Sequence, residues 1–378
     1  MKTLLSLSIS FALTLAGSHT LCAKSASSLY FKNAQTGSLK LGSITSLSFG
    51  PNGLLLVADS RNASIVGIDT GDTGPLQKLN KPVPKLDELV GAKMGAPGKN
   101  VRFVDLAVNP ASGKIYLGVL RQPGNVAGIL TVDAKGNIEP LATDKLNWVR
   151  VPMPAKEGAK VRNISDVAFA KDRILATGQS NEEFTSRIFV FPLPLTHDQS
   201  GTTYSAETYH VSHRRWETKA PIQSFVPLED NGKHFVVGAF ACTPIAKFPL
   251  DDIRSGANIR GTSVVELGSG NRPLDMFTYD SGGKKWVVTN TQRFHKNLFG
   301  SSKYWGLRLD LDYLLENDPS KINEKAARRN VKEKTGPVGF EIIDALFGAV
   351  QVDKLTDKEM VVLRENGEHF DLVVAKLP

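Results

Sequence analysis

A strand–turn–strand–loop–strand pattern recurs along this chain and constrains its fold more than any other feature. The pattern is clearest where three apolar, β-branched runs, residues 44–49, 54–58 and 63–68, follow one another. Pro51-Asn52-Gly53 separates the first two runs and supplies turn dihedrals that other residues adopt only at a cost. Short runs of this kind, ended by Gly, Asn, Asp or Pro, indicate an all-β chain.

The same unit returns four more times along the chain, each time with a small polar residue at the same place in its first strand. These five aligned residues are Ser46, Asp105, Asp166, Ser224 and Asp275, at spacings of 59, 61, 58 and 51. A sixth and weaker unit covers residues 349–374, after an insertion. Repeats of this length indicate a β-propeller, because small sheets that cannot bury both of their faces alone shield one another in a ring.

We therefore predict a single β-propeller of six blades. Seven blades remain an alternative if residues 300–345 contain another, and a pair of β-sandwiches is the competing fold. Residues 29–32 are expected to complete the last blade and close the ring. A charged stretch rich in Lys, Arg, Glu and Ala, residues 316–334, reads as an insertion helix exposed to solvent.

The chain begins with a pattern typical of a secretory signal peptide. Lys2 precedes an uncharged run of apolar and Ser/Thr residues, 4–16, and small residues suited to cleavage follow up to Ala23. We expect residues 1–23 to be removed and residues 24–378 to form the propeller in the periplasm or outside the cell. The chain has two cysteines, Cys22 and Cys242, and the cleavage site decides whether Cys22 is retained.

The charge of the chain is mildly basic, with 46 Lys and Arg against 38 Asp and Glu. This bias suits an anionic ligand, but without a basic helix or a recognition motif it does not indicate nucleic-acid binding. No transmembrane segment is expected, because no later stretch holds 18 consecutive apolar residues.

One repeat resembles a known family. Residues 44–68, with a Gly turn, the strand end Val57-Ala58-Asp59 and an Asn-x-x-Ile-x-x-Ile-type third strand, are similar to a repeat of the NHL-type six-bladed propellers. The resemblance is good over this repeat and loose over the rest. It implies a fold and says little about activity, because propellers carry many unrelated functions.

In a propeller, the loops that enter the innermost strands and the loops that join the second and third strands share one face around the axial channel. Residues that the pattern assigns to this face are expected to form a ligand-binding set: Arg61, Arg102, Arg162, Asn163, Asn271, Arg272, Arg293 and His295. Guanidinium groups bind carboxylate or phosphate in a two-pronged way. The alternative is that the arginines pair with strand-end acids such as Asp59, Asp105, Asp166 and Asp275 and so latch neighbouring blades.

Cys242 occupies the loop equivalent to that of Arg293, and His295 lies two residues further on. A thiol near a guanidinium and an imidazole would have a lowered pKa, which makes Cys242 a candidate reactive thiol. The alternative is a small buried cysteine at a strand end. We assign no catalytic residue and no metal ligand.

Two functions fit these observations. The first is an exported binding or scaffold protein, with no cofactor, whose arginine-rich face holds an anionic small molecule or another exported protein. The second is a metal-dependent lactonase or sugar-acid hydrolase with Ca²⁺ or another divalent ion in the channel. Asn163, Asn271, Asp59 and Glu182 could serve the second, but a metal surrounded by arginines is electrostatically poor.

Overall fold

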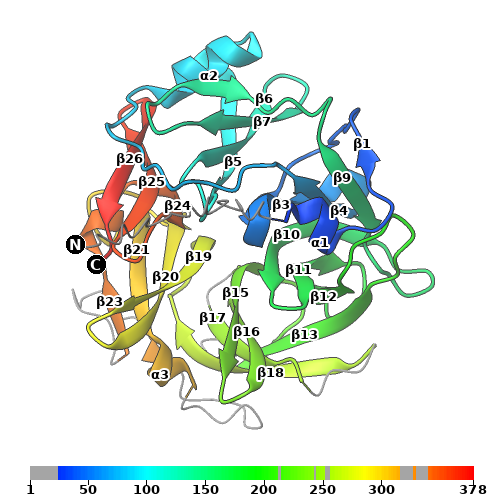
Figure 1. The fold of residues 1–378 in the computed structure, drawn as a ribbon. Helices are drawn as coiled ribbons and strands as arrows, with labels where there is room; N and C mark the ends of the chain where they lie inside the picture. Colours follow the sequence, from blue (N-terminus) through cyan, green and yellow to red (C-terminus); the bar gives the residue numbers. More distant parts are fainter. Residues whose placement is uncertain (1–23, 212–213, 242–243, 252–255, 316–326, 329–338) are drawn as a thin grey trace, which may run out of the picture.

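The computed structural model of the chain describes residues 24–211, 214–241, 244–251, 256–315, 327–328 and 339–378. They form a β-propeller in which small antiparallel sheets stand around a central axis (Figure 1). The predicted fold class is confirmed, and the sandwich alternative is wrong. None of the described helices has the length and the apolar character needed to cross a membrane.

The described strands form six antiparallel units, which we name after their innermost strands β2, β5, β10, β15, β19 and β24. The β2 unit contains β2 (Ser46–Phe49), β3 (Leu54–Asp59), β4 (Ser64–Asp69), β9 (Asn147–Pro152) and β1 (Gln35–Thr36). The β5 unit contains β5 (Val101–Val108), β6 (Ile115–Arg121), β7 (Val126–Val132) and β8 (Ile138–Pro140).

The next two units merge into one ten-stranded sheet, because their outer strands β13 and β18 pair in parallel. The β10 unit contains β10 (Val161–Ala170), β11 (Arg173–Ser180), β12 (Ser186–Pro192) and β13 (Thr202–His210), with β14 (Arg215–Glu217) beside β13. The β15 unit contains β15 (Ile222–Asp230), β16 (Lys233–Phe240), β17 (Pro244–Pro249) and β18 (Asn258–Glu266), with β22 (Ala327–Arg328) beside β18.

The last two units follow in chain order. The β19 unit contains β19 (Asn271–Ser281), β20 (Lys284–Arg293), β21 (Tyr304–Asp310) and β23 (Phe340–Ile342). The β24 unit contains β24 (Ala349–Lys354), β25 (Glu359–Asn366) and β26 (His369–Lys376). Of the strands described within residues 300–345, β21 and β23 belong to the β19 unit and β22 lies beside β18, so these strands form no further unit. Most of the predicted insertion at 316–334 lies outside the described residues.

The units do not follow one another around the axis in chain order. Contacts between innermost strands give the cyclic order β5, β2, β10, β15, β19, β24 and back to β5 (Figure 1). The chain leaves the β2 unit, builds the β5 unit on one side, and returns as β9 to the outer part of the β2 sheet. From β9 the chain continues around the axis in the opposite direction, through the β10, β15, β19 and β24 units. As a result, β5 contacts β24, the innermost strand of the last unit in the chain.

Buried apolar side chains fill the spaces between these sheets. Among the described residues there are six clusters of buried hydrophobic side chains, one between each pair of neighbouring units. Strands such as β3 and β4 are buried along their whole length, because each sheet is covered on both faces by its neighbours. This arrangement is the physical reason that one repeat could not fold alone.

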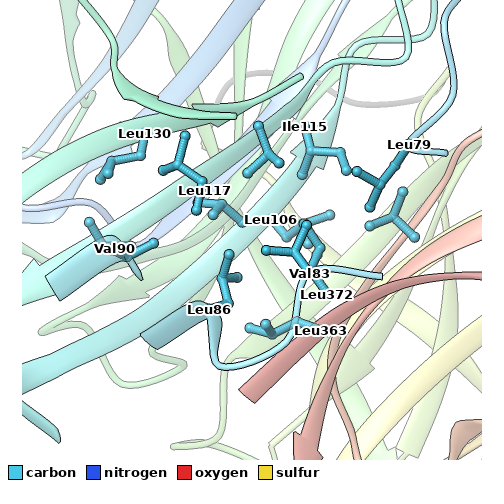
Figure 2. Close-up of a cluster of buried hydrophobic side chains, with 14 of the residues drawn as sticks. Leu79, Val83, Leu86, Val90, Leu106, Ile115, Leu117, Leu130, Leu363 and Leu372 are labelled. Atoms are coloured by element: carbon cyan, nitrogen blue, oxygen red, sulfur yellow. The ribbon is translucent and has the colours of Figure 1, made fainter. Parts of the chain in front are cut away.

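The ring closes between the β5 and β24 units. The cluster there joins both units to the helix α2 (Leu86–Met94), and Figure 2 shows Leu86, Leu106, Leu363 and Leu372 converging in it. Val83 and Leu372 also pair through their backbones, with Val83 N 2.9 Å from Leu372 O.

The expectation that residues 29–32 close the ring is wrong. Residues 26–30 form a short helix, α1 (Ala26–Tyr30), capped by the side chain of Ser25. Phe31 then forms a parallel bridge with Leu195 and packs between the β2 and β10 units. A further short helix, α3 (Leu311–Leu315), follows β21, and 3₁₀ turns stand at strand ends, as at Pro51–Gly53.

The closing cluster predicts a large effect for Leu372→Ala. Because Leu372 is fully buried, its truncation should leave a cavity and lower the free energy of unfolding by about 2–5 kcal/mol. The matched control is Leu89→Ala in α2, whose side chain is 45% exposed and whose loss should change stability by less than about 0.5 kcal/mol. Denaturant unfolding measures both. Equal effects of the two substitutions would contradict closure through this cluster.

Candidate functional site

A cavity of about 860 Å³ runs along the axis of the propeller. All six innermost strands contribute to its wall, so residues far apart in the sequence meet there. A second cavity, of about 360 Å³, lies beside Trp148 and Arg150. Propellers place ligand sites in such channels, where side chains from several strands converge.

A ring of polar side chains crosses this channel at the level of the aligned repeat position. Four of the five residues that the repeat predicted as equivalent line the cavity, and the fifth, Ser224, is buried at the same register position of β15 without lining it. Gln351 of the β24 unit is the sixth member, which the sequence repeat did not reveal. We call this set the axial ring: Ser46, Asp105, Asp166, Ser224, Asp275 and Gln351.

A local irregularity of the innermost strands places these side chains. In β5, β10, β15, β19 and β24 the pairing with the second strand shifts register at or beside the ring position. A β-bulge of this kind bends the strand and re-aims a side chain, and it frees one backbone N–H from the ladder. The bulge therefore re-aims the carboxylates of β5, β10 and β19, and the receiving strands β15 and β24 are bulged as well, whereas β2, which offers the Leu47 N–H, pairs without a register shift.

Acidic and neutral residues alternate around the axial ring. Going around the axis from one unit to its neighbour, the side chains of the ring are Asp105, Ser46, Asp166, Ser224, Asp275 and Gln351. Two carboxylates are thus never contributed by adjacent innermost strands. The alternation follows from the position of the β5 unit beside the β2 and β24 units; in chain order Asp105 and Asp166 would be neighbours.

The three carboxylates hold neighbouring units together. Asp105 accepts the backbone N–H of Leu47 at 2.6 Å, and Asp275 accepts that of Val352 at 2.9 Å. Asp166 bridges two neighbours, since it accepts the hydroxyl of Ser46 at 2.8 Å and the backbone N–H of Phe225 at 2.9 Å. Asp353, two residues beyond Gln351, accepts the backbone N–H of Val108 at 2.7 Å.

The latching role predicted as an alternative therefore exists, but with a different donor. Asp105, Asp166 and Asp275 latch neighbouring strands through backbone N–H groups, and among the described residues none of the three pairs with an arginine. Asp59 is the exception: its carboxylate pairs with Arg150 at 2.8 Å and also accepts backbone N–H groups, which together lower its pKa against the effect of burial.

Enclosure in the channel raises the pKa of the axial carboxyl groups. Desolvation is the main cause, and it raises the pKa of Asp105 to about 6 and that of Asp166 to about 7. Desolvation and the charge of Asp105 raise the pKa of Asp275 well above its ordinary value. Desolvation also raises the pKa of Asp353, to about 7. The backbone N–H bonds act in the opposite direction but do not compensate.

Three of the predicted face residues lie at one mouth of this channel. Arg102, Asn163 and Arg272 line the cavity close to the starts of β5, β10 and β19. Arg272 donates its Nε–H to Gln223 Oε1 at 2.9 Å. Partial burial and the positive charge of Arg102 both lower the pKa of Arg272, so the two guanidinium groups are near enough to repel each other.

The other predicted face residues do not line the cavity. Arg61 and Arg162 are exposed. Asn271 bonds the backbone around Leu267 and receives the indole N–H of Trp305. Arg293 donates to Asn297 and Ser269 and stacks over Phe299, while His295 is exposed and lies against Gly270. Cys242 lies outside the described residues.

No group of three or more His, Cys, Asp or Glu side chains in the described part of the chain is arranged to hold a metal ion. The calcium expected for the lactonase alternative thus has no assigned ligands, and the alternative stays a prediction.

No protein-family model matches this chain, and no curated protein matches it. The NHL resemblance of residues 44–68 therefore remains a prediction. Among solved structures, an exo-1,5-α-L-arabinanase from a bovine ruminal metagenomic library is similar at 14% identity, covering 74% of this chain and 95% of that one, with a TM-score of 0.38.

Two further solved structures show a likeness of the same order. A Trypanosoma rangeli sialidase mutant with trans-sialidase activity matches at 11% identity and a TM-score of 0.35, covering 94% of this chain but only 58% of its own. The yeast Nup82–Nup159–Nup116 nucleoporin complex matches at 8% identity and a TM-score of 0.38, covering 89% and 96%. Such low scores support no argument about what this chain does.

The raised pKa values predict that the axial ring makes the protein less stable as pH rises. A carboxyl whose folded pKa exceeds its unfolded value binds more protons when folded, so its stabilisation is complete below about pH 4 and is lost as pH rises through about 7. Asp166→Asn should make the free energy of unfolding less pH-dependent between pH 5 and 7, by on the order of 1 kcal/mol per pH unit.

Urea unfolding across this pH range measures the slope, with Asp280→Asn, an exposed acid in β19, as the control. A slope that Asp166→Asn leaves unchanged would show that Asp166 titrates in the folded protein as it does in water.

Proposed function

We propose that this chain is an exported binding protein that holds an anionic small molecule at the mouth of its axial channel. The observation that carries the proposal is the pair Arg102 and Arg272, which line the same cavity mouth close enough for one charge to lower the pKa of the other. Among the described residues neither guanidinium forms a salt bridge.

The chemistry of this pair suits a carboxylate. Two like charges held together in a partly desolvated mouth repel, and an anion placed between them removes the repulsion while gaining charge-assisted hydrogen bonds. The hydrogen bond that Nε of Arg272 donates to Gln223 Oε1 orients that guanidinium and leaves its terminal nitrogens for a ligand. A walled channel strengthens the attraction further, because its low dielectric focuses the field.

The export part of the proposal rests on residues 1–23 alone, which lie outside the described residues. The intact mass of the protein recovered from the producing cells tests it, because cleavage should remove a segment ending between Ser18 and Ala23. An uncleaved chain retained inside the cell would contradict it.

Arginine substitutions test the binding site. Arg102→Gln and Arg272→Gln should each weaken binding of a small carboxylate by about tenfold to a hundredfold, because each removes a charge-assisted, two-pronged contact. The matched control is Arg162→Gln, since Arg162 is an exposed arginine near the start of β10 that does not line the cavity. Its effect should stay within about twofold.

Calorimetry and thermal unfolding with a panel of mono- and dicarboxylates provide the measurement, because a ligand that binds only the folded state raises its stability. Absence of stabilisation by every anion, or an equal loss in Arg162→Gln, would contradict the proposal. Stabilisation by Ca²⁺ that a chelator reverses would instead favour the lactonase alternative.

A further inference from the structure

The axial channel holds two layers of ionisable side chains, one basic and one acidic, that form no salt bridge among the described residues. Arg102 and Arg272 form a positive layer at the mouth, and Asp105 and Asp275 form part of a negative layer in the axial ring. None of these four side chains takes part in a salt bridge among the described residues. Arg102 and Arg272 are exposed at the mouth, whereas Asp105 and Asp275 are enclosed, and an enclosed carboxyl group ionises readily only when a counter-charge is near it.

The two layers belong to the same sector of the channel. Arg102 precedes Asp105 by three residues in β5, and Arg272 precedes Asp275 by three residues in β19. Three residues of strand correspond to roughly 10 Å, so the layers are separated by the length of a small molecule. The β24 unit stands between the β5 and β19 units and carries Gln351 into the space between them.

Gln351 supplies an observation that does not depend on charge. Gln351 is only 6% exposed, and its Nε2 donates to the backbone carbonyl of Val104 at 3.3 Å. That bond fixes the orientation of the amide, and Oε1 is left without a partner among the described residues. A buried acceptor of this kind needs a donor, which a simple carboxylate ligand cannot supply.

We propose that the ligand is a zwitterion, with its carboxylate between Arg102 and Arg272 and its ammonium group at Asp105, Asp275 and Gln351. This proposal rests on the proposed function and names the ligand class of the same site. An ammonium group has three donors and no acceptor, so it satisfies Oε1 of Gln351 and neutralises the adjacent carboxylates at once. A hydroxyl group would satisfy Oε1 alone and leave the negative layer uncompensated.

Binding of such a ligand should release protons. Burial raises the pKa of Asp105 to about 6 and that of Asp275 well above its usual range, so the empty ring carries bound protons near pH 6. An ammonium group favours the ionised carboxylates and sends those protons to the buffer. The other charged groups that line the channel are Asp166, Asp353, Asp357 and Lys354 together with the two arginines, and Lys354 is already paired with Asp357.

A matched ligand set tests the proposal on the unaltered protein. The set is 5-aminopentanoate, pentanoate, pentylamine and 5-hydroxypentanoate, whose five-carbon chain suits the separation of the layers. Calorimetry at pH 6 should show 5-aminopentanoate binding at least about tenfold more tightly than the other three. Its enthalpy should differ between buffers of different ionisation enthalpy, in the direction of proton release.

A substitution in the ring gives a second readout. Asp275→Asn should remove most of the advantage of 5-aminopentanoate over pentanoate, while Asp280→Asn, an exposed acid of the same strand, should retain it. Because the ligand comparison on the unaltered protein stands by itself, a variant that fails to fold does not decide the matter.

The outcomes separate this inference from the proposed function. Equal binding of pentanoate and 5-aminopentanoate would overturn the zwitterion and leave the anion site standing. Equal binding of 5-hydroxypentanoate would show that the donor is a hydroxyl group, which also overturns it. If none of the carboxylates in the set or in the wider panel binds, both the inference and the proposed function fail.

Discussion

Carboxylates that accept backbone N–H groups of neighbouring strands are the interaction on which this propeller depends. The innermost strands of adjacent units share no β-ladder, so another bond must align them around the axis. Asp105, Asp166 and Asp275 provide it by reaching from one bulged strand to the next. Hydrogen bonds to an ionised group are worth about 1.5–3 kcal/mol each, but the raised pKa values of these carboxyls show that desolvation of the ionised form outweighs that gain.

The order of units around the ring makes this arrangement tolerable. Because the β5 unit lies between the β2 and β24 units, the neutral residues Ser46 and Gln351 flank Asp105. The return of the chain as β9 to the β2 sheet is the connection that allows this order, since it starts the second direction of travel. A layer of carboxyl groups with raised pKa values still forms on the axis, and guanidinium groups lie at the mouth above it.

The sequence repeat was sufficient to predict the class of fold and five of the six ring positions. Each unit carries the same local signals, so Ser46 and Asp275 could be aligned without knowing their neighbours. The order of the units could not be predicted in this way, because pairing of β9 with β4 is a long-range choice that no local pattern records. Gln351 escaped detection because a longer spacing of 76 residues and a different side chain separate it from Asp275.

Amide hydrogen exchange at Val352 tests the latching account most directly. In Asp275→Ala the backbone N–H of Val352 loses its acceptor, so its exchange should become at least about tenfold faster, while Leu47 N–H, which Asp105 accepts, should keep its protection. Unchanged protection at Val352 in a folded Asp275→Ala protein would contradict the account, because the strand would then be held without its carboxylate partner.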